Sequence, residues 1–86
     1  MTIPSRGTPE FWRLYRALPE AVRALARKNY ALWSANAFHP SLRFKSIGKP
    51  NWSVRVGDHY RAVGKFADNV FLWEWVGTHE EYNKRF

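Results

Sequence analysis

Apolar side chains near the start of the chain recur at three- and four-residue intervals, the spacing of one face of an α-helix. The positions that define this face are Phe11, Leu14, Tyr15 and Leu18. Thr8 precedes them as a candidate N-cap, with Pro9 at the first helical position, where its missing N–H is not needed. Because the residue before a proline avoids helical geometry, we expect this helix to end at Leu18-Pro19.

A second helix is predicted from Pro19 and Glu20 to about Asn36. Its apolar stripe consists of Val22, Leu25, Ala26, Leu32 and Trp33. Three basic residues fall away from that stripe, namely Arg23, Arg27 and Lys28. We interpret them as a solvated helix face, with a nucleic-acid contact as the alternative. Two helices joined by so tight a turn predict an αα-hairpin.

After His39-Pro40 the apolar period changes to two, which indicates β-strands. Trp52, Val54 and Val56 alternate with Ser53, Arg55 and Gly57. A loop at residues 57–59 then leads into a strand from Tyr60 to Phe66, and an Asp68-Asn69 turn leads into a strand from Val70 to Val76. This pattern predicts a three-stranded antiparallel meander.

The two ends of the chain have weaker patterns. Met1 to Gly7 contains Pro4 and Gly7, so we expect a loose arm with at most a short edge strand at Thr2 and Ile3. His79 to Phe86 is expected to form a short tail, for which a helix is one alternative. The predicted fold class is α+β: one domain over residues 1–86, with a helical hairpin packed on a three-stranded sheet, or a four-stranded one if the start pairs.

Two arginines are expected to face each other on this sheet. If residues 57–59 form the loop, Val56 pairs with Tyr60, and Arg55 lies opposite Arg61. Like charges directly opposed across two strands are unfavourable. They therefore suggest a face that meets an anion, because the arginine fork matches a phosphate. The alternative is that both extend into water or pair with Glu74.

The orientation of the last strand depends on the length of its turn. A two-residue Asp68-Asn69 turn places Phe71, Trp73 and Trp75 in the core and Glu74 beside the two arginines; a three-residue turn reverses this. We favour the first, because it leaves no buried carboxylate.

Charge changes the picture further. The 14 Lys and Arg against 7 Asp and Glu give a net charge of +7 and point to a polyanionic partner. Residues 43–65 contain one acid, Asp58, and six basic residues: Arg43, Lys45, Lys49, Arg55, Arg61 and Lys65. Such a stripe fits a phosphate backbone, and a solvated basic loop is the competing interpretation.

Several classes of protein are excluded by what the chain lacks. It has no Cys, so disulfides and thiolate metal sites are excluded, which fits a cytoplasmic protein. Its apolar runs are too short for a membrane span or a signal peptide. His39, His59 and His79 lack metal-ligand spacing, so we expect neither metal nor cofactor. His79 follows the last strand, where it suits either proton transfer or a structural role.

The order of two helices and a meander, together with four sequence segments, resembles the RelE/ParE toxin superfamily from Thr8 onward. The segments are L-P at 18–19, H-P-S-L-R-F-K at 39–45, W-S-V-R-V-G-D-H-Y-R-A-V-G at 52–64 and W-V-G-T-H-E-E-Y at 75–82. The resemblance implies a microbial-ribonuclease-like fold. Members usually begin with an edge strand, from which the start with Pro4 and Gly7 departs.

The resemblance to the RelE branch implies metal-independent cleavage of mRNA on the ribosome, which inhibits translation. In that branch the substrate 2′-hydroxyl attacks its own 3′-phosphate, so a base, an acid and cations are needed. Arg61 would stabilise the phosphorane with help from Arg55, and His79 and Tyr82 would act as acid, base or stacking groups. Arg43 and Lys45 match paired basic positions before the sheet, with Lys49 and Lys65 as further phosphate contacts. Glu74 is only a candidate for the general base.

The same resemblance leaves two alternatives open. The ParE branch shares the fold but inhibits DNA gyrase without nuclease activity, and a non-catalytic RNA-binding module would use the same basic surface. In either branch the resemblance implies an acidic antitoxin as partner, and we expect it to cover the face with Arg55 and Arg61. For the RelE branch the other partners are the ribosome and mRNA.

Overall fold

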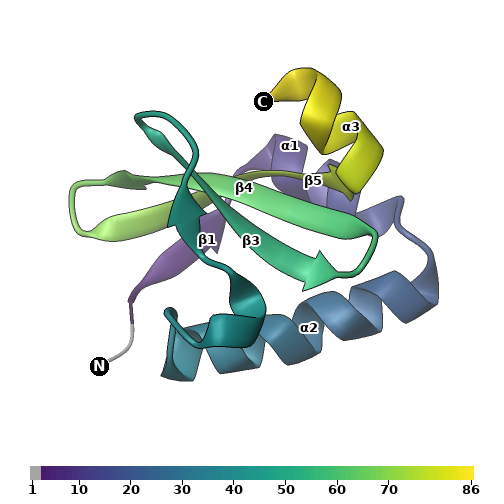
Figure 1. The fold of residues 1–86 in the computed structure, drawn as a ribbon, viewed down its shortest axis with the longest axis horizontal. Helices are drawn as coiled ribbons and strands as arrows, with labels where there is room; N and C mark the ends of the chain where they lie inside the picture. Colours follow the sequence, from purple (N-terminus) through teal and green to yellow (C-terminus); the bar gives the residue numbers. More distant parts are fainter. Residues whose placement is uncertain (1–2) are drawn as a thin grey trace.

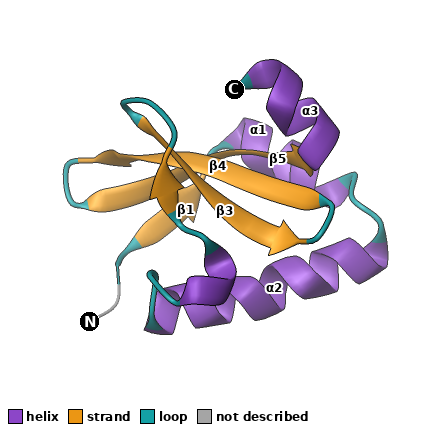
Figure 2. Cartoon of the chain, viewed as in Figure 1, coloured by secondary structure: helices purple, strands orange, loops and turns teal. Residues whose placement is uncertain are grey.

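A computed structural model describes residues 3–86 as a five-stranded mixed sheet with two helices on one face and a third on the other (Figures 1 and 2). The helical elements are α1 (Pro9–Arg16), α2 (Glu20–Ala35), the 3-10 helix η1 (Pro40–Leu42) and α3 (His79–Arg85). The strands are β1 (Ser5–Gly7), β2 (Lys45–Ser46), β3 (Asn51–Gly57), β4 (Tyr60–Ala67) and β5 (Val70–Thr78), in the sheet order β1-β5-β4-β3-β2. The α+β class and the antiparallel meander β3-β4-β5 are confirmed.

Strands at both edges enlarge the sheet beyond the meander. β1 pairs in parallel with β5, with Ser5 opposite Phe71, and β2 pairs antiparallel with β3. The prediction of a loose arm is therefore wrong for Ser5–Gly7; Ile3 lies outside the strand, and Thr2 lies outside the described residues. Pro4 precedes β1, where its missing N–H is not required, and its carbonyl accepts from the amide of Phe71 at 2.9 Å.

The helical hairpin begins and turns much as predicted. The Thr8 hydroxyl accepts from the Phe11 amide at 3.1 Å, while α1 ends at Arg16, ahead of the expected Leu18. Two basic residues of α2 do more than face solvent. Arg23 donates to the Leu18 carbonyl at 2.8 Å, and Arg27 donates to the Tyr15 hydroxyl at 3.1 Å. These contacts tie the two helices together across their connection.

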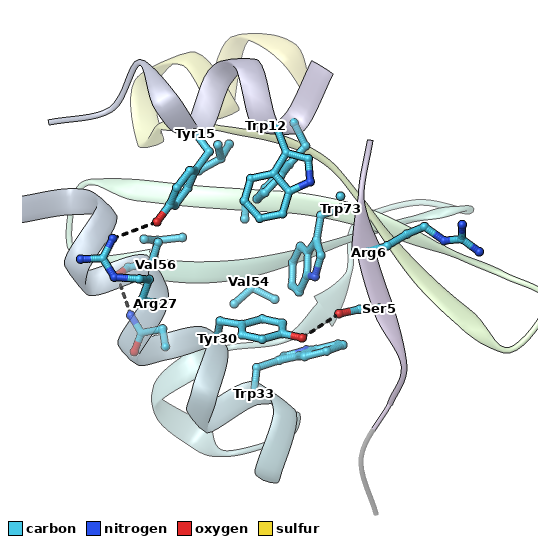
Figure 3. Close-up of a pocket in the computed structure, with 16 residues that line it drawn as sticks. Ser5, Arg6, Trp12, Tyr15, Arg27, Tyr30, Trp33, Val54, Val56 and Trp73 are labelled. Atoms are coloured by element: carbon cyan, nitrogen blue, oxygen red, sulfur yellow. Dashed lines mark hydrogen bonds between the residues drawn. The ribbon is translucent and has the colours of Figure 1, made fainter. Parts of the chain in front are cut away.

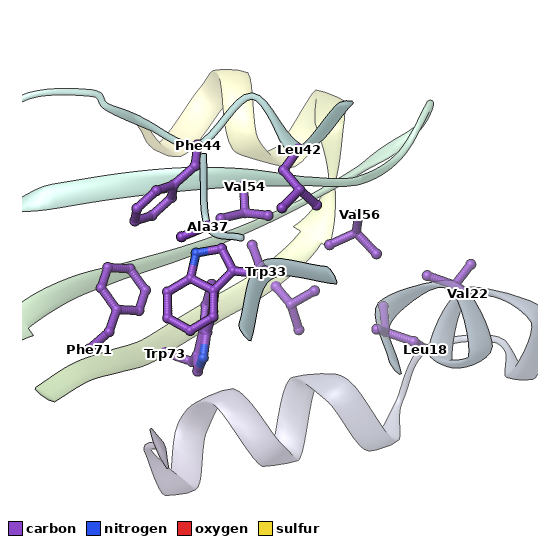
Figure 4. Close-up of a cluster of buried hydrophobic side chains, with 12 residues drawn as sticks. Leu18, Val22, Trp33, Ala37, Leu42, Phe44, Val54, Val56, Phe71 and Trp73 are labelled. Atoms are coloured by element: carbon purple, nitrogen blue, oxygen red, sulfur yellow. The ribbon is translucent and has the colours of Figure 1, made fainter. Parts of the chain in front are cut away.

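The core lies between the hairpin and the sheet (Figure 4). Trp33 of α2 is its centre at 1% exposure, with its ring 5.0 Å from Trp73 and 5.4 Å from Phe71. Leu42 and Phe44 close the end of the core beside α2. In the predicted α2 stripe, Val22 and Trp33 are buried and Ala26 and Leu32 are partly buried, whereas Leu25 remains 43% exposed.

A β-bulge changes the predicted hairpin between β3 and β4. Gly57 pairs with Tyr60, and Arg55 pairs with Arg61, so Val56 is the extra residue. The loop is thus the two residues Asp58-His59, and the predicted Val56–Tyr60 pair is wrong. The predicted opposition of Arg55 and Arg61 is confirmed, because the bulge compensates for the shorter loop.

The hairpin between β4 and β5 has the predicted two-residue Asp68-Asn69 turn, with Ala67 opposite Val70. A second bulge follows at Glu74, since Trp73 pairs with Gly64, whereas Trp75 pairs with the residue before Gly64. An extra residue in one strand re-aims the side chains beyond it.

The bulge at Glu74 sends the two halves of β5 to different faces. Phe71 and Trp73 belong to the core as predicted, but Val76 rather than Trp75 continues it. Trp75 is buried on the opposite face, with its ring 5.4 Å from that of Phe86. The predicted placement of Trp75 in the core is therefore wrong.

Replacing Gly64 with alanine is expected to destabilise the fold by about 2 kcal/mol, because the added methyl group overpacks the sheet. A Cβ there would lie 2.3 Å from the Leu72 carbonyl oxygen and 2.4 Å from the Phe71 ring. Gly57→Ala is the matched control, since its Cβ would meet only the mobile end of Leu25 at 3.2 Å. Urea unfolding measures both, and equal midpoints would contradict the prediction.

Candidate functional site

A recess of about 200 Å³ lies on the sheet face that the helical hairpin leaves open. Its lining residues, which we call the cationic recess, are Arg43, Lys45, Ser53, Arg55, Arg61, His79 and Tyr82. They come from the end of η1 and from β2, from β3 and β4, and from α3, which lies across the sheet from α2 (Figure 1). All four residues predicted as catalytic therefore line one cavity.

Arg61 is the most constrained cation of the recess. Its Nη1 donates to the carbonyl oxygens of Gly57 and Tyr60, both at 2.9 Å. These bonds hold the side chain against the β3–β4 turn. Within residues 3–86, Nε and Nη2 make no hydrogen bond, so they can bind an anion. Burial, and then the charge of Arg55, lower the pKa of the Arg61 guanidinium. An arginine nevertheless stays protonated at neutral pH, so the recess is built to attract negative charge.

Arg55 has a partner that the sequence did not reveal. Its Nη2 donates to Oδ1 of Asp58, in the β3–β4 turn. The predicted alternative pairing with Glu74 is wrong, because Glu74 instead lies 3.5 Å from Nζ of Lys65. The Glu74 carboxylate is outside the residues that line the recess, so it is not placed to act as its base.

Arg43 and Lys45 reach the recess through an alternation of buried and exposed side chains. Leu42 and Phe44 enter the core, while Arg43 and Lys45 are exposed and line the cavity. Between Leu42 and Phe44, Arg43 has a φ of 49° in the left-handed region at the end of η1. Both cations nevertheless line the same recess.

His79 and Tyr82 are placed by the start of α3. Thr78 is its N-cap, and a capping box joins Thr78 to Glu81 in both directions. The His79 amide donates to the His59 carbonyl at 2.7 Å, which ties α3 to the β3–β4 turn. The rings of His79 and Tyr82 lie 5.9 Å apart. The hydrogen bonds from Thr78 lower the pKa of Glu81, so that carboxylate is occupied in capping.

Two predicted phosphate contacts do not line the recess. Lys49 lies in the turn between β2 and β3, and Lys65 is engaged with Glu74. Two neighbours of the site, Ser53 and Asp58, were not predicted from the sequence. Ser53 is 2% exposed and lines the recess. It lies opposite Val63 and two residues before Arg55 on the same strand, and this spacing from Arg55 could have predicted its position. Asp58 was noted only as the single acid of the basic stripe.

No cluster of three or more His, Asp or Glu side chains among residues 3–86 is arranged to hold a metal ion. Over the same part of the chain, no helix has the length and apolar character needed to span a bilayer.

A second cavity, the helix groove, lies between α1, α2 and the sheet (Figure 3). It measures about 460 Å³ and is mostly apolar, with Trp12 and Tyr15 on the α1 side, Tyr30 on the α2 side and Trp73 on the sheet. Arg6 and Arg27 lie on its border. The indole N–H groups of two lining residues, Trp33 and Trp73, are buried without a hydrogen-bond partner among the described residues.

A cationic recess on the open face of a small α+β sheet, with a helical hairpin behind it, defines a RelE-type toxin fold. The chain belongs to the ParE-like toxin domain family, whose sequence model matches residues 20–84. The resemblance to the RelE/ParE toxin superfamily is thus confirmed.

Solved structures agree with this assignment of the fold. A mutant of the E. coli toxin RelE in the free state aligns with 20% identity and a TM-score of 0.73, covering 96% of this chain and 90% of that one. A chain of the E. coli DinJ–YafQ toxin–antitoxin complex aligns with 11% identity and a TM-score of 0.70, covering 94% and 97%. The YoeB/ParE toxin from Agrobacterium tumefaciens aligns with 12% identity and a TM-score of 0.68, covering 88% and 98%. A sequence search of curated proteins found no match.

Proposed function

We propose that this protein is the toxin of a type II toxin–antitoxin pair and cleaves mRNA on the ribosome, without a metal, in the cytoplasm. One observation carries the proposal: four cations, a histidine and a tyrosine converge on a recess of about 200 Å³. Guanidinium and ammonium groups at such close quarters favour a phosphate with growing negative charge.

The reaction that fits this arrangement is intramolecular transfer of a phosphoryl group within the RNA, from the 5′-oxygen to the 2′-oxygen. The substrate 2′-oxygen forms a bond to the adjacent phosphorus, and the bond from phosphorus to the 5′-oxygen breaks. A base removes the proton of the 2′-hydroxyl, and an acid protonates the leaving 5′-oxygen. The products are a 2′,3′-cyclic phosphate and a 5′-hydroxyl, so no water is consumed in this step.

Six residues of the recess have a role in the proposal. The free donors of Arg61, assisted by Arg55, stabilise the phosphorane. Arg43 and Lys45 hold the phosphate from the other wall. His79 transfers a proton, and Tyr82 transfers a proton or stacks on a base. Lys49 and Lys65 contact phosphates farther along the strand.

RNA binding by the toxin is expected to depend strongly on salt. If about four phosphates are neutralised, the logarithm of affinity for a single strand should fall with the logarithm of salt concentration at a slope of roughly −3. Titration of a labelled oligoribonucleotide at several salt concentrations measures this slope. A slope near zero would show that charge does not drive the binding.

A ParE-like inhibitor of DNA gyrase is the second candidate, because the matching family is described as ParE-like. Induction in growing cells separates the two. The nuclease proposal predicts growth arrest with cleaved mRNA on ribosomes. Intact mRNA with altered DNA supercoiling would favour gyrase, and normal growth without either effect would reject both.

Two surfaces fit the partner antitoxin. Chains similar in fold have been solved in toxin–antitoxin complexes, including the RelE–RelB complex of Pyrococcus horikoshii. An acidic segment suits the cationic recess, and the helix groove suits an apolar segment with acidic ends near Arg6 and Arg27.

Replacing Trp12 with alanine is expected to weaken the antitoxin complex by about tenfold or more, since aromatic anchors dominate such interfaces. Leu25→Ala is the matched control: both side chains are 43% exposed on the hairpin, but only Trp12 lines the groove. Calorimetry with the proposed antitoxin would compare them. Equal losses would place the antitoxin away from the groove.

A further inference from the structure

Asp58 is the only carboxylate among residues 3–86 with a charged contact to a residue of the cationic recess. Four of the other six acids contact residues outside the recess: Glu10 pairs with Arg13, Glu74 with Lys65, Glu80 with Lys84, and Glu81 with Thr78. Glu20 begins α2, and Asp68 lies in the β4–β5 turn, so both are on parts of the chain that contribute no residue to the recess.

The position of Asp58 follows from the two opposed arginines. Arg55 and Arg61 face each other across β3 and β4, and the turn that joins these strands carries Asp58 directly beside them. Its Oδ1 accepts from Nη2 of Arg55, and its charge opposes the lowering of the pKa of Arg61. The side chain of Asp58 is 74% exposed, whereas that of Arg55 is 31% exposed. The carboxylate is therefore free to rotate into solvent while Arg55 stays in the recess.

We propose that Asp58 determines the specificity of the recess by acting as a competing anion on Arg55. It occupies the guanidinium that a phosphate needs, so a phosphate gains Arg55 only when other contacts of the same ligand displace the carboxylate. An RNA strand held along its backbone supplies such contacts, whereas an isolated phosphate does not. This inference rests on the proposed function, because it assumes that the recess receives an RNA phosphate.

The energetics favour such a displaceable contact. An exposed ion pair is weak, so a multivalent polyanion can replace it at little cost. A carboxylate that remains near the recess also repels each arriving phosphate, which reduces binding to RNA that makes few contacts. Removing the charge of Asp58 should therefore strengthen binding to short RNA, the opposite of what loss of a supporting contact would do.

The test compares Asp58→Asn with Asp68→Asn. Both remove one negative charge from an exposed two-residue turn, but only Asp58 contacts Arg55. The probe is a short single-stranded oligoribonucleotide with 2′-O-methyl groups, which cannot be cleaved because the attacking hydroxyl is blocked. We expect Asp58→Asn to bind it up to about fivefold more tightly than wild type, the range of one exposed ion pair. The salt slope should steepen by about 0.7, as for one more phosphate neutralised on a single strand.

Further variants test whether the tighter binding of Asp58→Asn depends on Arg55. In an Arg55→Ala background, Asp58→Asn should leave the affinity unchanged, because the competed group is absent. Asp58→Glu should restore wild-type affinity and slope. Thermal melting of every variant checks that the fold is intact.

The outcomes separate this inference from the proposed function. If no variant binds the probe in a salt-dependent way, the proposed function fails and the inference with it. If wild type binds with the expected slope but Asp58→Asn and Asp68→Asn behave alike, only the inference is overturned. Weaker binding by Asp58→Asn also overturns it, and would make Asp58 a positioning residue for Arg55.

Discussion

Replacing Arg61 with alanine is expected to slow cleavage of ribosome-bound mRNA by about a hundredfold, which corresponds to about 3 kcal/mol of transition-state stabilisation. The reason is the direction of its free donors. Two turn carbonyls hold Nη1, so Nε and Nη2 remain for the phosphate, and no rearrangement is needed as charge develops there. The measurement is single-turnover cleavage with purified ribosomes and a short mRNA.

The same substitution should leave the domain folded. Alanine removes the two hydrogen bonds to the turn, but it also relieves the repulsion between Arg55 and Arg61. We expect the free energy of unfolding to change by no more than about 1 kcal/mol. Arg61→Lys is the control, because it keeps the charge but loses the fork, and it should recover only part of the rate. Full activity of Arg61→Ala in a folded protein would remove Arg61 from the mechanism.

Replacing His79 with alanine is expected to slow cleavage by about a hundredfold or more if its imidazole transfers a proton. Of the histidines within residues 3–86, His79 alone lines the recess, and it is held by the first turn of α3 rather than by core packing. Alanine is well tolerated in a helix, so α3 should persist.

His59→Ala is the matched control for this substitution. His59 lies in the β3–β4 turn and contacts α3 through its carbonyl oxygen, which alanine retains, while its side chain does not line the recess. We expect cleavage by His59→Ala to stay within a few-fold of wild type. If His79→Ala also cleaves at the wild-type rate, then proton transfer belongs to another group of the recess, with Tyr82 tested next by Tyr82→Phe.

The periodicity of the sequence was sufficient for much of the fold. The helical spacing from Phe11 and the alternation from Trp52 predicted the hairpin and the meander, because burial of one face requires those periods. The opposition of Arg55 and Arg61 and the Asp68-Asn69 turn also followed from local pattern. Strand β1 could not be predicted this way, since its three residues become a strand only through hydrogen bonds to β5.

The sequence was sufficient to predict candidate residues of the site but not which of these residues lie together. The basic positions and the His79–Tyr82 pair are visible in the chain, and tertiary structure decides which of them meet: Arg43, Lys45, Arg55 and Arg61 enter the recess, and Lys49 and Lys65 do not line it. The bulge at Glu74 is the physical reason why the predicted placement of Trp75 was wrong. A single extra residue re-aims side chains along β5, and whether a strand accepts it depends on the partner strand, where Gly64 leaves the room that a larger residue would fill. Sequence pattern determines which side chains are available, and the register between strands, set by contacts distant in the chain, decides which of them share a site.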